Sequence, residues 1–158
     1  MLTLEDKLEL YELNARYVDA MDDCNWHALS SIFTQDAIFE VVGLVTMNGL
    51  SEIQHFMAEE GRHPLAHLIT NTHFSISSER IEMRSRGIFP IDDTIKEAGH
   101  RVFYGSYYDS AVKQEEGWRI NHRIFSAKRI ACKEASVQIS TSWRVLCAVS
   151  ISDPEDIL

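Results

Sequence analysis

The order in which two hydrophobic periodicities follow each other along the chain constrains its fold most. Up to about residue 60, apart from a strand-like run at 37–42, apolar residues recur at the three- and four-residue spacing of helices. From Leu65 onward they alternate in the manner of strands. Helices that come first and an antiparallel meander that follows are typical of α+β domains. We therefore expect an α+β fold in which N-terminal helices pack against one mostly antiparallel sheet.

Three helices are expected before most of the strands. Thr3 and Asp6 have the spacing of a capping box, which predicts that the first helix begins near residue 4 and runs to about residue 22. Its apolar stripe is expected at Leu4, Leu8, Tyr11, Ala15 and Val18. A second, short helix is expected over residues 26–33, and a third begins after Gly49 and ends near Gly61 and Pro64.

The rest of the chain is expected to form strands at residues 37–42, 66–78, 80–90, 97–113 and 117–130, with a hairpin turn at 115–117. A length of 158 residues suits one core, so we assign residues 1–132 to one domain and residues 133–158 to a C-terminal extension. The loose alternation at 136–151 leaves three possibilities open, namely an edge strand, an arm exchanged with a partner, or a tail.

Composition argues against several classes of function. A net charge of −9 without any Lys/Arg-rich run argues against nucleic acid as a partner. Three widely spaced cysteines indicate neither a disulfide framework nor a zinc site. Without a secretory signal or a run of about 18 apolar residues, a soluble cytoplasmic protein with no membrane contact is expected. The scattered glycines match no nucleotide fingerprint, and Pro64 separates His63 from His67, so we expect neither a cofactor nor a metal.

Asp22 is the first candidate for chemistry. It follows Leu4 by eighteen residues, or five helical turns, so a helical wheel places its carboxylate on the azimuth of the expected stripe. A carboxylate that points toward the core needs a partner, because an unpaired charge away from water is strongly unfavourable. Two interpretations stay open: Asp22 caps a turn or bonds the backbone of the second helix, or it pairs with a catalytic group.

A histidine-containing strand after the third helix supplies the next candidates. His67, Asn71 and His73 have even spacing, which predicts that they share one unusually polar strand face. If Asp22 orients His67, the imidazole can act as a general base, with Asn71 and His73 as substrate-binding residues on the same face. His100 is an alternative source of a second acid.

The last hairpin adds Tyr107 and Arg123. Tyr107 belongs to an aromatic-rich strand before the turn and is a candidate for substrate binding. Arg123 follows the turn, and an inward guanidinium beside a pocket can hold an anion or a departing group. An outward Arg123 is an ordinary surface charge, and the sequence leaves both orientations open.

A series of residues between positions 4 and 130 carries a resemblance to a known family. These are residues 22–26, Leu29, Phe33, Asp36, Ala37, Gly49, His67, Asn71, Gly105, Tyr107, Asp109, residues 117–120 and Arg123. In this order and spacing they resemble the SnoaL-like branch of the nuclear transport factor two-like superfamily. That branch includes scytalone dehydratase, γ-hexachlorocyclohexane dehydrochlorinase and polyketide cyclases.

The resemblance implies a cone-shaped α+β barrel, with a curved sheet and three helices around an apolar pocket, often assembled as dimers or trimers. It also implies a catalytic dyad at Asp22 and His67, because the dehydratase and dehydrochlorinase members carry an aspartate and a histidine at these positions. A pocket arginine of the dehydrochlorinase falls at Arg123. The chain departs from scytalone dehydratase at Met21 and in the first strand, where that enzyme has tyrosines.

We therefore expect a cofactor-independent lyase that catalyses dehydration or another β-elimination on a small, largely apolar molecule. The protein is also expected to form a homo-oligomer, either a dimer or a trimer. Two alternatives stay open. The same dyad suits an isomerase or cyclase of natural-product biosynthesis, and the superfamily also contains ligand-binding modules without catalysis.

Overall fold

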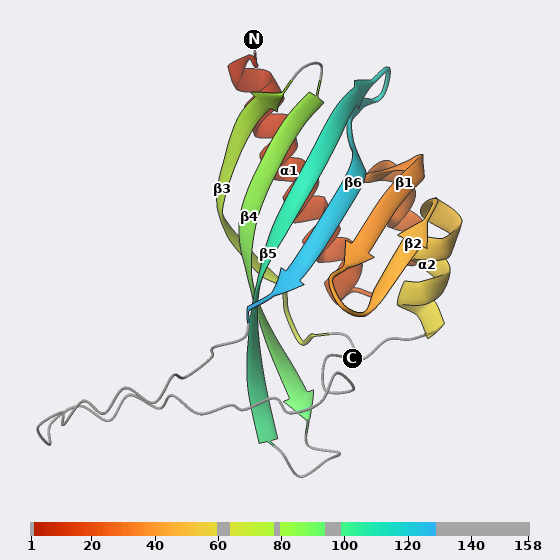
Figure 1. Cartoon of the computed structure of the whole chain (residues 1–158), viewed down its shortest axis with the longest axis vertical. Helices are drawn as coiled ribbons and strands as arrows, with labels where there is room; N and C mark the ends of the chain where they lie inside the picture. Colours follow the sequence, from red (N-terminus) through yellow and green to blue (C-terminus); the bar gives the residue numbers. More distant parts are fainter. Residues whose placement is uncertain (1, 60–63, 78–79, 94–98, 129–158) are drawn as a thin grey trace, which may run out of the picture.

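Figure 1 shows the computed structural model of the protein, which describes residues 2–59, 64–77, 80–93 and 99–128. The elements are, in chain order, α1 (Leu4–Asp22), the 3₁₀ helix η1 (Trp26–Ser31), β1 (Phe33–Val41), β2 (Val45–Asn48), α2 (Leu50–Glu59), β3 (Leu68–Ser77), β4 (Arg80–Asp93), β5 (Gly99–Gln114) and β6 (Gly117–Ala127). The predicted C-terminal extension at 133–158, with its alternating segment at 136–151, lies outside the described residues.

The six strands form one curved sheet in the order β2-β1-β6-β5-β4-β3. Neighbouring strands are antiparallel except for β1 and β6, which run parallel. In Figure 1, α1 crosses behind the sheet, whereas α2 lies beside β1 and β2. The core therefore fills the space between the helices and the face of the sheet that they cover.

The α+β prediction is confirmed, with helices packed on a curved sheet that stays open between its edge strands β2 and β3. The first helix has the predicted bounds, and the second forms as the 3₁₀ helix η1. The short strand β2 was missed. It has only four residues and depends on a turn in which Gly43 adopts a positive φ of 81°, which glycine tolerates without steric cost.

The buried face of α1 differs from the predicted stripe. The helix buries Asp6, Leu10, Leu13, Asn14, Tyr17, Ala20 and Met21. Leu4 and Leu8 of the predicted stripe are instead 71% and 56% exposed. The prediction was wrong because two stripes with helical spacing run along this helix. The stripe that faces the sheet includes the polar residues Asp6 and Asn14. Both can be buried because strand β6 supplies hydrogen-bond donors for them.

A bulge in β3 changes which side chains share a face. The pairing with β4 shifts between Thr70 and His73, where two residues of β3 stand opposite one residue of β4. Asn71 takes a left-handed conformation there, with φ at 53°. His67, which lies before the bulge, is buried, whereas Asn71 and His73, which lie at and after it, are exposed, so the predicted common face was wrong. Even spacing assumes an unbroken strand, and the bulge interrupts this one.

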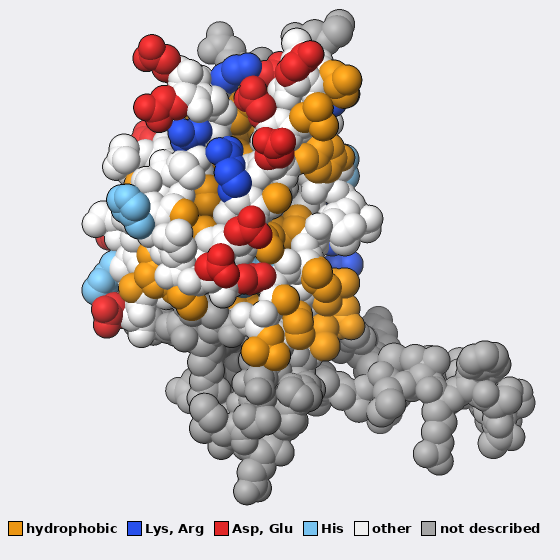
Figure 2. Space-filling view, turned by 180° about the vertical axis from the view of Figure 1, so that it is seen from behind, with side chains coloured by type: hydrophobic (Ala, Val, Ile, Leu, Met, Phe, Trp, Pro, Cys, Tyr) orange, Lys and Arg blue, Asp and Glu red, His pale blue; other side chains and the backbone are white. Residues whose placement is uncertain are grey.

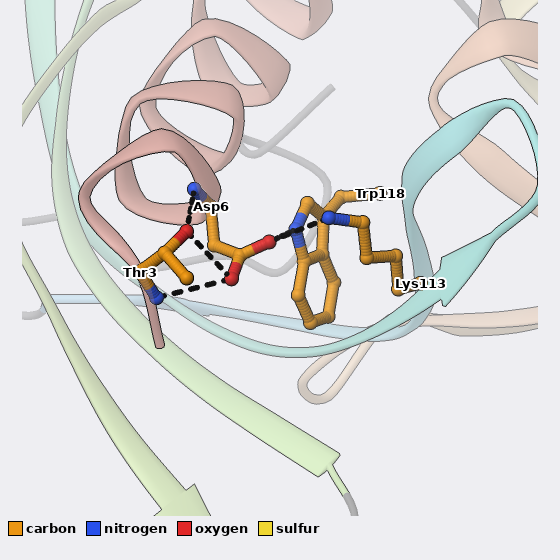
Figure 3. A network of polar contacts seen from close by, with 4 residues as sticks. All are labelled: Thr3, Asp6, Lys113 and Trp118. Atoms are coloured by element: carbon orange, nitrogen blue, oxygen red, sulfur yellow. Dashed lines mark hydrogen bonds and ion pairs between the residues drawn. The ribbon is translucent and has the colours of Figure 1, made fainter. Parts of the chain in front are cut away.

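A polar network joins the start of α1 to the hairpin between β5 and β6 (Figure 3). Thr3 and Asp6 complete the predicted capping box, with Asp6 N–H donating to Thr3 Oγ1 at 3.0 Å and Thr3 N–H donating to Asp6 Oδ2 at 3.1 Å. Asp6 Oδ1 also accepts from Lys113 Nζ at 2.7 Å and from Trp118 Nε1 at 3.0 Å. The Lys113 ammonium, with the N–H groups of Thr3 and Trp118, holds the pKa of Asp6 well below its usual range.

The substitution Asp6→Asn should lower the melting temperature at pH 7 and make stability less dependent on pH. Because the pKa of Asp6 is lower in the folded than in the unfolded state, its contribution is complete above the unfolded value of about 3.9. That contribution is lost as the pH falls through the lower, folded-state value. Thermal unfolding between pH 2.5 and 7 tests this, with the exposed first-turn variant Glu5→Gln as control. A deficit in the melting temperature of Asp6→Asn that is as large at pH 2.5 as at pH 7 would contradict this expectation.

Candidate functional site

Two hydrogen bonds join Asp22, the last residue of α1, to His67, which directly precedes β3. Asp22 Oδ1 lies 2.5 Å from His67 Nδ1, and Asp22 Oδ2 accepts the backbone N–H of His67 at 3.0 Å. Because an ionised carboxylate only accepts hydrogen bonds, the contact assigns the ring proton to Nδ1 and makes Nε2 the basic nitrogen. The hydrogen bond to the backbone N–H fixes the chain at residue 67, and the contact with Nδ1 fixes the ring.

Aromatic rings hold the His67 imidazole on its other sides. The Tyr17 ring lies edge-to-face at 6.2 Å between centroids, and the Phe89 ring does so at 5.1 Å. Phe89 reaches this position by lying over Gly87 of the same strand, where a Cβ would overlap the phenyl ring. The His67 side chain is only 5% exposed, whereas that of Asp22 is 24% exposed. The imidazole is thus held in a largely apolar environment.

A groove of about 410 Å³ runs between α1 and the start of β3, and His67 forms part of its wall. Its other walls include Asn14, Ala15 and Val18 from α1, and Leu68 and Ile69 from β3. Figure 2 views this helical side of the molecule, and hydrophobic side chains gather along the side where β3 lies, on the right. The volume of the groove falls in the range of small-molecule sites, about 300–1,000 Å³.

Arg123 is fully buried behind the groove and is held by several partners. Its Nε and Nη2 donate to the two carboxylate oxygens of Asp109 at 2.8 and 2.9 Å, and Nη2 also donates to Asn14 Oδ1 at 3.0 Å. The guanidinium carbon lies 4.0 Å from the ring centre of Tyr17 and 4.6 Å from that of Tyr107. The inward orientation of Arg123, which the sequence left open, is therefore the one the fold adopts.

Burial shapes the protonation states of this cluster. It raises the pKa of Tyr17, an effect that the positive charge of Arg123 partly offsets, and it raises the pKa of Tyr107 well above the ordinary value. Burial also opposes the charge of Arg123, but the Asp109 carboxylate outweighs it and raises the pKa of Arg123. Both phenols are therefore neutral and Arg123 is charged at neutral pH.

Three of the predicted site residues are buried, namely His67, Tyr107 and Arg123, and Asp22 lies at the rim in contact with His67. Asn71 and His73 lie on the exposed side of β3 because of the bulge. The side chain of His100, the alternative acid, lies outside the described part of the structure. Binding and catalytic roles of these residues stay predictions.

Two further properties concern metals and membranes. No group of three or more potential metal-binding side chains occurs within the described ranges. None of the helices in that part of the chain combines the length and the apolar composition needed to cross a membrane.

Three residues of this region were missed in the sequence, namely Asn14, Tyr17 and Phe89. A signal existed for Tyr17, because Leu10, Leu13, Tyr17 and Ala20 repeat at spacings of three, four and three residues. Asn14 adjoins that stripe, but its burial depends on Arg123, which is 109 positions away in the chain. The contact between Phe89 and His67 depends on the register of β4, which no local pattern reveals.

The sequence matches the SnoaL-like domain family over residues 2–124. An uncharacterised protein of Mycobacterium tuberculosis (strain ATCC 25618 / H37Rv) is 30% identical over 128 residues. That match covers 77% of this chain and 84% of the relative. Most of the described part of the chain thus lies within the region of family similarity.

Solved structures of low sequence identity share the fold. A putative scytalone dehydratase from Novosphingobium aromaticivorans DSM 12444 has a TM-score of 0.69 at 18% identity, over 80% of this chain and 86% of the other. A hexachlorocyclohexane dehydrochlorinase from Novosphingobium barchaimii LL02 has a TM-score of 0.71 at 14% identity, over 80% and 88% of the two chains. At these identities the likeness concerns the fold alone.

The substitution Asp109→Asn should destabilise the protein by about 3–5 kcal/mol, because it leaves the buried Arg123 charge uncompensated. Urea unfolding at pH 7 measures the change. The matched control is Glu116→Gln, since Glu116 pairs with Arg119 at 3.4 Å but its side chain is 86% exposed. That control should cost less than about 1 kcal/mol. Equal small losses in both variants would show that the buried pair does not hold the interior together.

Proposed function

The chain belongs to the family of SnoaL-like domains, and on this premise we propose that it is a cofactor-independent lyase that catalyses β-elimination. His67 Nε2 removes a proton from carbon, the electrons of that C–H bond form a C=C double bond, and a hydroxide or halide leaves from the neighbouring carbon. The observation that carries the proposal is the 2.5 Å contact between Asp22 Oδ1 and His67 Nδ1 beside the groove.

The pair suits both proton transfers that such a reaction needs. While the ring takes up the substrate proton, the Asp22 carboxylate keeps it in one tautomer and stabilises the imidazolium that forms. When hydroxide leaves, the imidazolium can return that proton to it, so that the products are the alkene and water. No electrons are gained or lost overall, which is why no redox cofactor is part of the proposal.

The surroundings of the pair support a small, largely apolar substrate. Aliphatic side chains of α1 and β3 line the groove beside His67, together with the polar residues Asp19, Thr70 and Thr72. The aromatic rings that surround the imidazole lower the local polarity, which strengthens the electrostatic interaction between Asp22 and a protonated ring. Two proteins of similar fold are described as a putative dehydratase and a dehydrochlorinase, and both names denote eliminations. This agreement supports the lyase class without identifying the substrate.

Arg123 has a positioning role in this proposal. Its charge is already neutralised by two hydrogen bonds to Asp109, so little of it remains to stabilise a developing anion. It packs against Tyr17, whose ring in turn contacts His67. A direct contact between Arg123 and a leaving group stays a prediction from the sequence.

The substitution His67→Ala should reduce the rate of elimination by at least about 100-fold, the usual lower limit for loss of a general base. We choose 3-hydroxy-1-tetralone as the probe, because loss of water produces 1-naphthol, which is followed by its absorbance. Asp22→Asn, which removes the charge but retains a hydrogen-bonding group, should slow the reaction in the same direction. The matched control is His55→Ala, since His55 is exposed on α2.

Deuterium at C2 of the probe should slow the wild-type reaction if proton removal limits the rate. Circular dichroism and melting temperatures establish that each variant is folded. A folded His67→Ala protein with the wild-type rate would rule out His67 as the base. If wild type neither dehydrates this probe nor eliminates HCl from hexachlorocyclohexane, and yet binds 1-tetralone in the groove, the lyase proposal is replaced by a ligand-binding role.

A further inference from the structure

The amide of Asn14 has an orientation that its partner determines. Asn14 Oδ1 accepts a hydrogen bond from Arg123 Nη2 at 3.0 Å. A guanidinium group carries only donors, so the amide atom that faces Arg123 has to be the oxygen. The Nδ2 group of Asn14 therefore points away from Arg123, and the usual ambiguity between the two ends of an amide does not arise here.

The Nδ2 group of Asn14 is a hydrogen-bond donor that is buried without a partner. Asn14 is only 4% exposed, and leaving such a donor unpaired costs about 1–3 kcal/mol. Arg123 does not require Asn14 to balance its charge, because Asp109 already binds it through two hydrogen bonds. An aliphatic residue at position 14 would avoid the cost, so the retained amide calls for another explanation.

Asn14 lies in the wall of the groove that His67 also lines. The nearby wall residues Ala15 and Val18 offer no hydrogen bonds, and the hydroxyl of Tyr11 already donates to the Thr72 carbonyl at 2.9 Å. The α1 wall also includes the carboxylate of Asp19, which only accepts hydrogen bonds when ionised, so Asn14 is the amide donor on that side of the groove. Its shielding from water strengthens any hydrogen bond that a ligand forms there.

We propose that Asn14 Nδ2 donates a hydrogen bond to an acceptor oxygen of the bound ligand, and that this contact selects carbonyl compounds. The inference rests on the proposed function, since it describes the substrate on which His67 acts. Asn14 and His67 line the same groove, Asn14 from α1 and His67 from the start of β3, so one ligand can meet both. The ligand class is a largely apolar ketone whose reactive C–H lies toward His67.

The substitution Asn14→Asp tests this role because it retains an oxygen for Arg123 and replaces the donor with an acceptor. The probes are 1-tetralone, which only accepts, 1-tetralol, which also donates, and tetralin, which does neither. Calorimetric titration should show that wild type binds 1-tetralone about tenfold more tightly than tetralin, the size expected for one hydrogen bond. In Asn14→Asp, the ketone should lose this advantage while the alcohol retains it.

The matched control is Thr34→Val, because Thr34 has a buried, unpartnered hydroxyl on β1 away from the groove. That variant should leave the order of the three affinities unchanged. The proposal is overturned if wild type does not prefer 1-tetralone to tetralin. It is also overturned if Asn14→Asp weakens ketone and alcohol equally, because Asn14 then serves only to support Arg123. The affinities are measured without turnover, so they can be interpreted even if the protein proves not to be a lyase.

Discussion

The buried ion pair between Arg123 and Asp109 is the interaction on which the interior of this protein depends. Both side chains are completely removed from water, where unpaired charges are strongly unfavourable, so their geometry tolerates little change. The pair joins β6 to β5, and its third hydrogen bond, to Asn14, extends it to α1. The position and rotation of α1 over the sheet are therefore tied to a charge in the sheet.

The location of the candidate site follows from that attachment. The guanidinium of Arg123 packs on Tyr17, which also contacts His67, and Asp22 ends the same helix. A helix fixed at Asn14 and at its capped N-terminus presents Asp22 at a defined place, where the carboxylate holds residue 67 by both ring and backbone. The groove between α1 and β3 is thus bounded by elements that the polar contacts fix.

Asp22 and His67 are in contact, although the helical wheel that pointed to Asp22 rested on the wrong stripe of α1. The helical wheel assumed that Leu4 and Leu8 face the core, but both are exposed. Asp22 shares their azimuth and accordingly lies at the rim, with about a quarter of its side chain in water. Family resemblance, rather than wheel geometry, therefore provided the better reason to pair these two residues.

The sequence by itself determined the order of the elements other than β2, the bounds of α1 and the turn before β6, because capping, periodicity and turn chemistry depend on neighbouring residues. Only the tertiary structure decided which stripe of α1 is buried, since burial of Asp6 and Asn14 requires donors from distant strands. It also decided that Asn71 and His73 face outward, because a bulge arises from the pairing of two strands. Local patterns specify elements, whereas the partners of buried polar groups specify how those elements meet.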